Sequence, residues 1–313
     1  MEPISYSPRR AAQLLNVEPK ALAAALRKDA YSALDLLALR QKMKRVPAPL
    51  GPRRQLFLNF KGGTGKTSLS TSYAFRMAEM GYRVLLIDLD SQGHATKCLG
   101  LEGESFEKTL LEVLVKRAPI AEVIVQSGQP QLDLVPSNLS MSTIDLALMP
   151  LAGREYKLRN ALKDVEGQYD LTILDAPPSF GLLNLNALIA ADDLIVPVLA
   201  DFLSFHGLKL LFETVEGLEQ DLQHHLDHVF IAINAFNATF KLAKEAQEAL
   251  QAHYGEYLCK TVIRQCTKFA QASSEGLPVF AVDPESKGAQ DIQALIDELT
   301  GVLSKSAGKP KSR

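Results

Sequence analysis

The chain has 313 residues, enough for one large α/β domain with a small appendage or for two domains. Hydrophobic residues make up 47% and charged residues 22%, an ordinary globular balance that excludes the disordered and fibrous classes. The net charge of −2 is spread unevenly: residues 1–54 contain 11 Lys or Arg and 4 Asp or Glu, giving +7, so the remainder carries −9. This asymmetry favours a polyanionic partner for the basic segment, with a solvated basic surface as the alternative.

The cysteines and the apolar segments indicate the cellular compartment in which the protein is expected. Cys98, Cys259 and Cys266 are too few and too scattered for a disulfide framework or a zinc site. The longest apolar region, around residues 181–200, is interrupted by Asn and Asp and cannot cross a bilayer as a helix. The first ten residues lack the apolar core of a secretory signal. We therefore expect a cytoplasmic protein in a reducing environment.

Three helices are predicted before the first strand. Apolar residues recur at helical spacing in two short stretches within residues 8–28, with the sequence NVEPK as the turn between them. A third helical run covers residues 31–45, and residues 46–54, rich in Pro and Gly, have the composition of a linker. Residues 1–50 are thus expected to form a small helical N-terminal extension with its linker.

Strand and helix patterns alternate from Gln55 onward. Apolar stretches predict strands at residues 55–60, 83–88, 132–136, 170–175, 193–199 and 228–234. Helical stretches follow at residues 66–80, 105–117, 153–165, 205–219, 240–253 and 289–304. This order predicts an α/β fold, a doubly wound and mostly parallel sheet with helices on both faces. We expect this domain to span residues 51–304, and the basic residues 305–313 to form a disordered tail.

The stretch NFKGGTGKTS, residues 59–68, lies between a predicted strand and a predicted helix and is typical of a phosphate-binding loop. Its glycines let backbone N–H groups approach phosphate oxygens, and the N-terminus of the following helix favours an anion. Lys66 provides a cation for the outer phosphates, and the Thr67 hydroxyl is a ligand for Mg²⁺. The candidate nucleotide-binding residues here are Gly62, Gly63, Thr64, Gly65, Lys66, Thr67 and Ser68.

The loop departs from the standard spacing, with Phe60 where a glycine is expected and a second lysine, Lys61, at its front. An extra cation beside a triphosphate neutralises charge that develops on the phosphoryl oxygens. Lys61 acts either on the nucleotide of its own chain or on that of a neighbouring chain. The residues alone leave both possibilities open.

Acidic residues at the ends of predicted strands add the groups that a metal-dependent site needs. Asp88 and Asp90 follow one strand, and Asp175 ends another. Ligands bind at the carboxyl ends of strands in open α/β sheets, where acids hold the metal and position the attacking water. Capping of a helix N-terminus is the alternative role. Three such acids beside a phosphate loop favour the metal site.

The order of the motifs KGGTGKT, DLDSQG and DAPP resembles that of the ParA/MinD superfamily of deviant Walker-A ATPases. The sequence DLDSQGHAT and the run over residues 261–299 favour the ParA branch, and the likeness covers about residues 55–303. The resemblance implies ATP and Mg²⁺ as cofactors and a homodimer that closes face to face over two ATP molecules. It also implies that Lys61 reaches into the site of the partner subunit.

The same resemblance assigns roles within the site. Lys61, Lys66 and Asp90 are the candidate catalytic residues, with Asp90 orienting the attacking water. The metal site is implied to comprise Thr67, Asp88 and Asp175.

Two further residues are implied to contact the base, and two depart from the family pattern. Asn234 matches the position that meets the adenine edge, and Pro284 is expected to border the same base. Ser68 replaces the usual second threonine and keeps a hydroxyl. His94 stands where Asn is commoner, and we expect a neutral surface histidine there.

We expect the ATP-bound dimer to bind DNA and not a membrane. The C-terminus lacks the basic amphipathic helix of membrane-bound relatives. ParA-type dimers hold DNA nonspecifically through basic residues, and Arg264 and Lys268 lie at about the matching place; solvated surface charges are the alternative. Residues 8–28 are similar to the helix-turn-helix segments that precede some ParA-type ATPases, with a dimer-stabilising arm as the alternative.

We therefore expect a cytoplasmic, nucleoid-associated ATPase with a weak intrinsic rate that segregates or positions a cargo. Its hydrolysis would be stimulated by an adaptor of the ParB type, and the cargo would be a plasmid, a chromosome locus or a protein complex. A nucleotide-switched transcriptional repressor with little hydrolysis is the alternative from another class. A reductase similar to the nitrogenase iron protein would need cluster-ligating cysteines where this chain has none.

Overall fold

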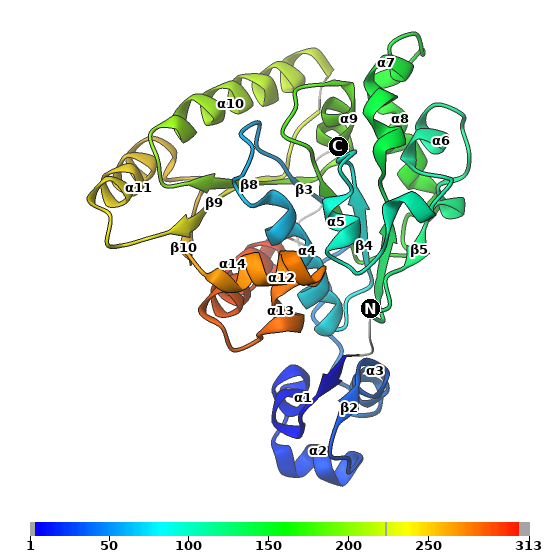
Figure 1. The fold of residues 1–313 in the computed structure, drawn as a ribbon, viewed down its shortest axis with the longest axis vertical. Coiled ribbons are helices and arrows are strands. Elements are labelled where there is room, and N and C mark those ends of the chain that lie inside the picture. Colours follow the sequence, from blue (N-terminus) through cyan, green and yellow to red (C-terminus); the bar gives the residue numbers. More distant parts are fainter. Residues whose placement is uncertain (1–3, 223, 307–313) are drawn as a thin grey trace.

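The main feature of the computed structural model, which describes residues 4–222 and 224–306, is an eight-stranded sheet (Figure 1). The strand order is β10-β9-β8-β3-β7-β4-β6-β5. The strands are β3 (Arg53–Phe57), β4 (Val84–Asp88), β5 (Val125–Gln126), β6 (Leu132–Val135), β7 (Leu171–Asp175), β8 (Asp193–Leu199), β9 (His228–Phe236) and β10 (Leu258–Arg264). All neighbouring pairs are parallel except β5 with β6. The predicted mostly parallel α/β sheet is confirmed.

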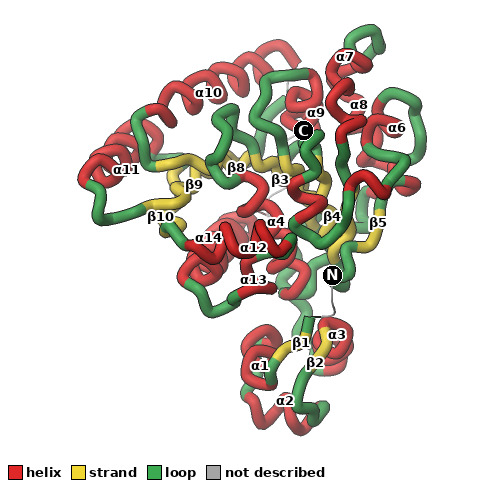
Figure 2. The backbone as a smooth tube through the Cα atoms, viewed as in Figure 1, coloured by secondary structure: helices red, strands yellow, loops and turns green. Residues whose placement is uncertain are grey.

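Helices cover both faces of this sheet, as Figure 2 shows. One face is covered by α6 (Leu110–Leu114), α7 (Ile144–Leu148), α8 (Lys157–Leu162), α9 (Leu182–Ala190), α10 (Leu203–Leu222) and α11 (Lys241–Tyr254). The other face is covered by α4 (Lys66–Glu79), α5 (His94–Lys97), α12 (Thr267–Glu275), α13 (Val279–Val282) and α14 (Lys287–Ser306). Short 3₁₀ turns lie at Gly103–Ser105, Ile120–Glu122, Leu139–Thr143, Arg154–Tyr156 and Lys163–Val165.

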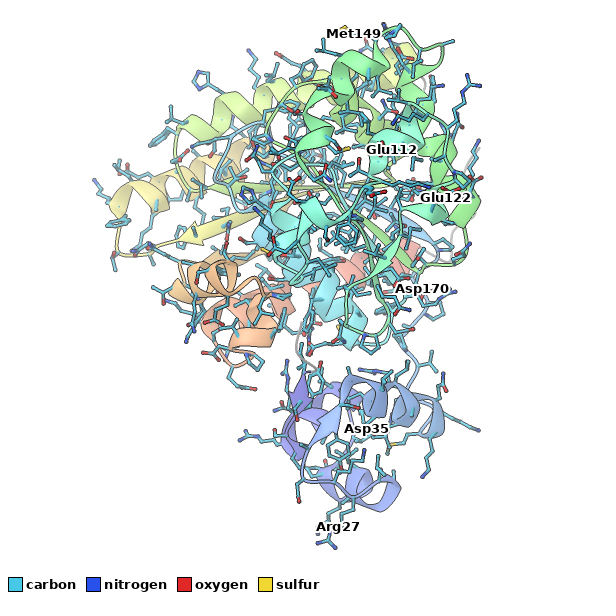
Figure 3. The ribbon with its side chains drawn as sticks, turned by 45° about the vertical axis from the view of Figure 1, so that its right-hand side comes forward. Arg27, Asp35, Glu112, Glu122, Met149 and Asp170 are labelled. Carbon is cyan, nitrogen blue, oxygen red and sulfur yellow. The ribbon has the colours of Figure 1, made fainter. Side chains whose placement is uncertain are left out.

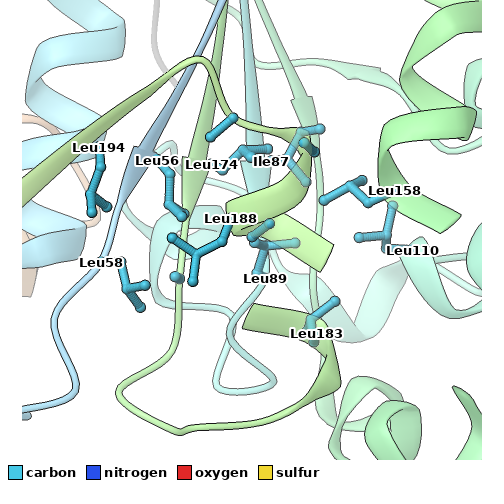
Figure 4. Packing of buried hydrophobic residues seen from close by; sticks show 14 of the residues in the cluster. Leu56, Leu58, Ile87, Leu89, Leu110, Leu158, Leu174, Leu183, Leu188 and Leu194 are labelled. Carbon is cyan, nitrogen blue, oxygen red and sulfur yellow. The ribbon is translucent and has the colours of Figure 1, made fainter. Parts of the chain in front are cut away.

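Alternate residues of each central strand enter two separate hydrophobic cores. On β3, Leu56 belongs to the core beneath α9 and Phe57 to the core beneath α4. Figure 4 shows the first core, in which Leu56 and Leu174 of the sheet face Leu188 of α9. Because strand side chains alternate between faces, a strand buried on both sides is apolar throughout. This explains why the central strands were recognisable from sequence.

A separate set of elements precedes the sheet, and we call residues 4–43 the N-terminal unit. It contains β1 (Ser5–Tyr6), α1 (Pro8–Leu15), α2 (Pro19–Ala25), β2 (Tyr31–Ser32) and α3 (Ala33–Lys42). β1 and β2 pair antiparallel. Ser7 caps α1 with Pro8 in its first turn, and Ser32 forms a capping box with Asp35 at the start of α3. The unit has its own cluster of buried apolar side chains.

The N-terminal unit contacts the end of α4 that lies away from the glycine-rich loop. The buried Arg40 guanidinium donates hydrogen bonds to the carbonyl oxygens of Leu14 (2.6 Å) and Glu79 (2.7 Å). Since α4 begins at Lys66, the two ends of this helix are about 20 Å apart. Figure 3 shows Arg27 at the tip of the N-terminal unit and Met149 at the opposite end of the molecule. No helix in the described ranges is long and apolar enough to span a membrane.

Several elements differ from the sequence-based expectation. The stretches 105–117 and 153–165 are mostly 3₁₀ turns and loops around the short helices α6 and α8. The third N-terminal helix starts at Ala33, after the two residues of β2. β10, α9, α12 and α13 were not predicted. α14 continues to Ser306, so the first two residues of the expected tail are helical; residues 307–313 lie outside the described ranges.

Candidate nucleotide-binding site

The glycine-rich loop connects the end of β3 to the start of α4, as predicted. Gly63 and Gly65 have φ angles of +74° and +89°, a conformation that favours glycine. A Cβ at Gly65 would lie 2.1 Å from Nδ2 of Asn234, whereas one at Gly62 or Gly63 would meet nothing within 4 Å. Gly65 is therefore required on two grounds, its backbone conformation and the close approach of β9.

Lys66 is the first residue of α4, and its side chain reaches back to the glycine-rich loop. Its side chain is buried, and its Nζ donates a hydrogen bond to the Lys61 carbonyl oxygen at 3.2 Å. Burial lowers the pKa of Lys66 below its usual value, while the charges of Asp175 and Asp90 oppose the shift. Within the part of the chain that the structure describes, a backbone carbonyl is the only hydrogen-bond acceptor of this ammonium group, and a phosphate would be a stronger one.

Asp175 is bound by two hydroxyl groups of α4. Thr67 Oγ1 donates to its Oδ2 and Ser70 Oγ to its Oδ1, both at 2.8 Å. Burial raises the pKa of Asp175 to about 6, although the two hydrogen bonds lower it. Ser70 was not predicted, but its spacing of three residues from Thr67 places both hydroxyls on one face of the helix.

Asp88 lies directly beside Asp175, because the two residues are register partners on β4 and β7. Its Oδ2 accepts hydrogen bonds from the backbone N–H (2.8 Å) and hydroxyl (2.7 Å) of Thr96, and its Oδ1 from the N–H of Asp90 (3.2 Å). Burial, followed by the charge of Asp175, raises the pKa of Asp88 to about 7. Asp88 thus holds residues 90–96 in place, a task that its sequence position did not reveal.

The paired buried acids and the Thr67 hydroxyl fit a divalent cation. Two neighbouring carboxyl groups whose pKa values are raised are those that a cation would stabilise in the ionised form. Their oxygen donors are the type that Mg²⁺ prefers. Thr67 and Asp175 are suited to hold the ion, and Asp88 supports it from the adjacent strand.

Asp90 begins the segment that Asp88 holds. Its Oδ1 accepts a hydrogen bond from the N–H of Gln92 at 3.0 Å, forming a local turn. Its charge acts on both Lys66 and Asp175, so it belongs to the same electrostatic group. His94, in the following helix, is exposed.

Lys61 forms an ion pair that neither of its predicted roles anticipated. Its Nζ lies 2.7 Å from Oδ2 of Asp201, in the loop between β8 and α10. Burial raises the pKa of the Asp201 carboxyl, but hydrogen bonds from Lys61 and Ser204 outweigh this and hold it below its usual range. In the single chain, Lys61 is therefore directed to an acid of its own subunit.

The two residues predicted to contact the base lie apart from each other in the chain. Asn234 donates from Nδ2 to the Thr64 carbonyl oxygen at 2.8 Å, which places it against the loop. Pro284 lies in the turn between α13 and α14. Contact of either residue with adenine stays a prediction.

Both residues that are predicted to contact DNA lie near acidic side chains. Arg264 forms hydrogen bonds with both carboxylate oxygens of Asp291, the shortest 2.7 Å. Lys268 Nζ lies 3.6 Å from Asp283 and 3.0 Å from Gln271 Oε1. Arg264 therefore pairs closely with Asp291 and joins β10 to α14, whereas Lys268 is paired less closely with Asp283.

Comparison with known proteins identifies a matching family and several similar proteins. A family model described as an AAA domain matches residues 55–228. The chain is 72% identical to the cell division protein PomZ of Myxococcus xanthus, over 96% of this chain and 94% of that protein. It is 34% identical to the sporulation initiation inhibitor protein Soj of Bacillus subtilis, over 74% and 92% respectively. A cobyrinic acid a,c-diamide synthase structure from Mycobacterium smegmatis, with bound ATP analog and magnesium, superposes with a TM-score of 0.70 at 28% identity, over 82% of this chain and 97% of that one.

Proposed function

Because the chain belongs to the ParA/MinD superfamily of P-loop ATPases, we propose that it hydrolyses ATP with Mg²⁺ to position a cell-division assembly over DNA. The observation that carries the enzymatic part is the connection of the glycine-rich loop to the buried acids through Thr67 and Asp175. The relative at 72% identity favours a cell-division cargo over a plasmid or chromosome locus.

Each residue of the site has a task in phosphoryl transfer. The backbone N–H groups of the loop and Lys66 bind the phosphates. Thr67 and Asp175 would hold Mg²⁺, which would neutralise charge on the phosphate oxygens when bound. Asp90 orients the water for attack, since it lies within the electrostatic reach of Lys66 and Asp175.

A second copy of the chain is the proposed cover of this site. Large apolar side chains surround the loop and face solvent: Phe180 is 70%, Phe202 53% and Leu203 71% exposed. Phe180 contacts Phe60 of the loop edge-on, with ring centroids 5.3 Å apart. Phe202 and Leu203 follow Asp201, the partner of Lys61. A homodimer would bury these side chains and bring Lys61 to the partner's nucleotide.

The closed dimer would then bind DNA nonspecifically. Lys268 is the better of the two predicted contacts, because Asp291 neutralises Arg264 more fully than Asp283 does Lys268. An adaptor protein on the cargo, analogous to ParB-type adaptors, would stimulate hydrolysis and release the dimer. A nucleotide-switched repressor remains the second candidate, since the basic N-terminal residues could contact an operator.

The test is nucleotide-dependent binding to duplex DNA of arbitrary sequence, followed by fluorescence anisotropy. With ATP and Mg²⁺, the hydrolysis-blocked Asp90→Ala chain should bind, and affinity should fall steeply with salt. With ADP, or with Lys66→Ala, binding should be lost. Equal binding with ATP and ADP, or sequence-specific binding without any stimulated hydrolysis, would contradict the proposal and favour the repressor.

The cargo is tested in cells. Depletion of the protein should misplace division septa, and a fluorescent fusion should gather at the division site. If plasmids or chromosome loci are lost while septa stay in place, the cell-division assignment is wrong and the partition role is right.

A further inference from the structure

A cavity of about 430 Å³ lies where the N-terminal unit meets the ATPase domain, and we call it the junction groove. Three parts of the chain form its walls: the end of α1 at residues 13–16, Arg40 of α3 with the following segment 44–48, and residues of the ATPase domain that include Arg76 and Gln293. A volume of this size is typical of small-molecule sites.

The lining of the junction groove is strongly basic. It contains Arg40, Lys44, Arg45 and Arg76 and neither Asp nor Glu. A second cavity of about 500 Å³ shares Gln13, Asn16 and Arg45 with the groove and adds one base, Arg9, and one acid, Glu18. Part of the N-terminal excess of positive charge seen in the sequence thus lies in the junction groove.

The cations of the groove are only partly compensated by the protein. Arg40 donates to backbone carbonyl oxygens alone, at 2.6, 2.7 and 3.4 Å. Arg76 Nη1 donates a hydrogen bond to Glu79 Oε2 at 3.0 Å, and its Nε donates one to Gln293 Oε1. Within the described ranges, the side chains of Lys44 and Arg45 form no ion pair or hydrogen bond. Burial, followed by repulsion from Arg76, lowers the pKa of Arg40 to about 10.

An independent observation at the same junction indicates a missing negative charge. Arg10 is mostly buried and interacts with the charges of Arg76 and Glu79. Its Nη1 lies 3.9 Å from the exposed carboxylate of Glu285, but its Nη2 has no hydrogen-bond partner among the described residues. Three guanidinium groups thus surround one buried carboxylate, that of Glu79. Buried cations that outnumber the nearby carboxylates are costly, and a bound anion would offset that cost.

We propose that the junction groove binds a phosphate group, at a site separate from the glycine-rich loop. Guanidinium groups match phosphate oxygens in geometry and charge, and the exposed side chains of Lys44 and Arg45 line the groove, where they can contact a ligand. The phosphate belongs either to a small phosphorylated molecule or to the DNA backbone. Its binding would fasten the N-terminal unit to the end of α4, whose other end forms the nucleotide site.

The test uses the full chain carrying Lys66→Ala, which weakens phosphate binding by the loop. Inorganic tripolyphosphate is titrated by calorimetry into this chain, into the same chain with Lys44→Glu and Arg45→Glu, and into a control with Arg159→Glu and Lys163→Glu. The control makes the same change in charge at exposed residues of α8 and the turn after it. Circular dichroism and thermal unfolding show that each variant is folded. DNA binding of the two charge-reversal pairs is then measured with ATP in the Asp90→Ala chain.

The proposal expects saturable tripolyphosphate binding that is weakened about tenfold or more by the groove pair, about 1.4 kcal/mol, and not by the control pair. If the groove pair also weakens DNA binding, the backbone is the source of the phosphate; if only tripolyphosphate binding falls, a small molecule is. The proposal is overturned if the groove pair and the control pair bind both probes equally, whether both at the unsubstituted affinity or both weakened.

Discussion

Replacing Asp201 by Asn should strengthen ATP-dependent dimerisation. In the single chain Asp201 holds Lys61 at 2.7 Å, so this ion pair must break before Lys61 can reach a partner's nucleotide. Asn keeps the side-chain oxygen that accepts from Ser204 N and Oγ, both at 2.9 Å, and thus the start of α10. The substitution therefore removes the charge that holds Lys61 and little else.

The size of the effect follows from the exposure of the pair. The side chains are 27% and 38% exposed, so each pair contributes about 0.5–1 kcal/mol rather than the value of a buried pair. A symmetric dimer breaks two such pairs, which amounts to about 1–2 kcal/mol and a roughly five- to thirtyfold lower dissociation constant.

Sedimentation equilibrium with ATP and Mg²⁺ measures this constant directly, in an Asp90→Ala background that blocks hydrolysis. Asp164→Asn is the matched control, because it removes one exposed carboxylate far from Lys61 in the chain. If Asp201→Asn leaves the dissociation constant unchanged or raises it, the ion pair does not restrain dimerisation and the reasoning is wrong.

Three further predictions concern the loop, the buried acids and the DNA surface. Gly65→Ala should abolish binding of a fluorescent ATP analogue while circular dichroism is retained, because φ is +89° and the new Cβ would lie 2.1 Å from Asn234 Nδ2. The folded pKa of Asp88, about 7, lies above the ordinary 3.8, so the folded chain keeps a proton that the unfolded chain has lost between those values. The free energy of unfolding of the unliganded wild type should accordingly fall as pH rises through this window, by up to roughly 1.4 kcal/mol per pH unit. Urea unfolding of Asp88→Asn should lack this part of the pH dependence. Parallel pH profiles of stability for the two chains would contradict this prediction. Lys268→Gln should reduce the slope of log affinity for DNA against log salt by about one, whereas Arg264→Gln should lower the melting temperature more than the DNA affinity; the reverse pattern would show that Arg264 is the phosphate contact.

Local patterns in the sequence were sufficient for the sheet and the loop. The central strands are buried on both faces and therefore appear as continuous apolar runs, and the glycine-rich loop has a fixed spacing of residue types. The edge strand β10 and helix α12 were missed because both are half exposed and their sequences mix polar and apolar residues. α9 was considered only as an apolar stretch, since its asparagines Asn184 and Asn186 make hydrogen bonds inside the fold that no local pattern indicates.

The partners of the site residues depended on distant parts of the chain. Asp201 is 140 residues from Lys61, and no spacing rule connects them. The role of Asp88 in holding Thr96 depends on the path of the backbone after β4. The neutralisation of Arg264 by Asp291 arises only when α14 lies beside β10. The sequence indicated which side chains are chemically active, and tertiary packing decided which of them are already paired.

A mixing experiment tests most directly whether Lys61 acts across a dimer. Lys61→Ala chains keep Asp90 and Asp90→Ala chains keep Lys61, so each homodimer alone should hydrolyse ATP poorly. In an equal mixture, half of the dimers contain one chain of each kind and one complete site, and stimulated hydrolysis should recover to about a quarter of the wild-type rate. If the mixture is no more active than its separate components, Lys61 acts on the nucleotide of its own chain, and the central claim fails.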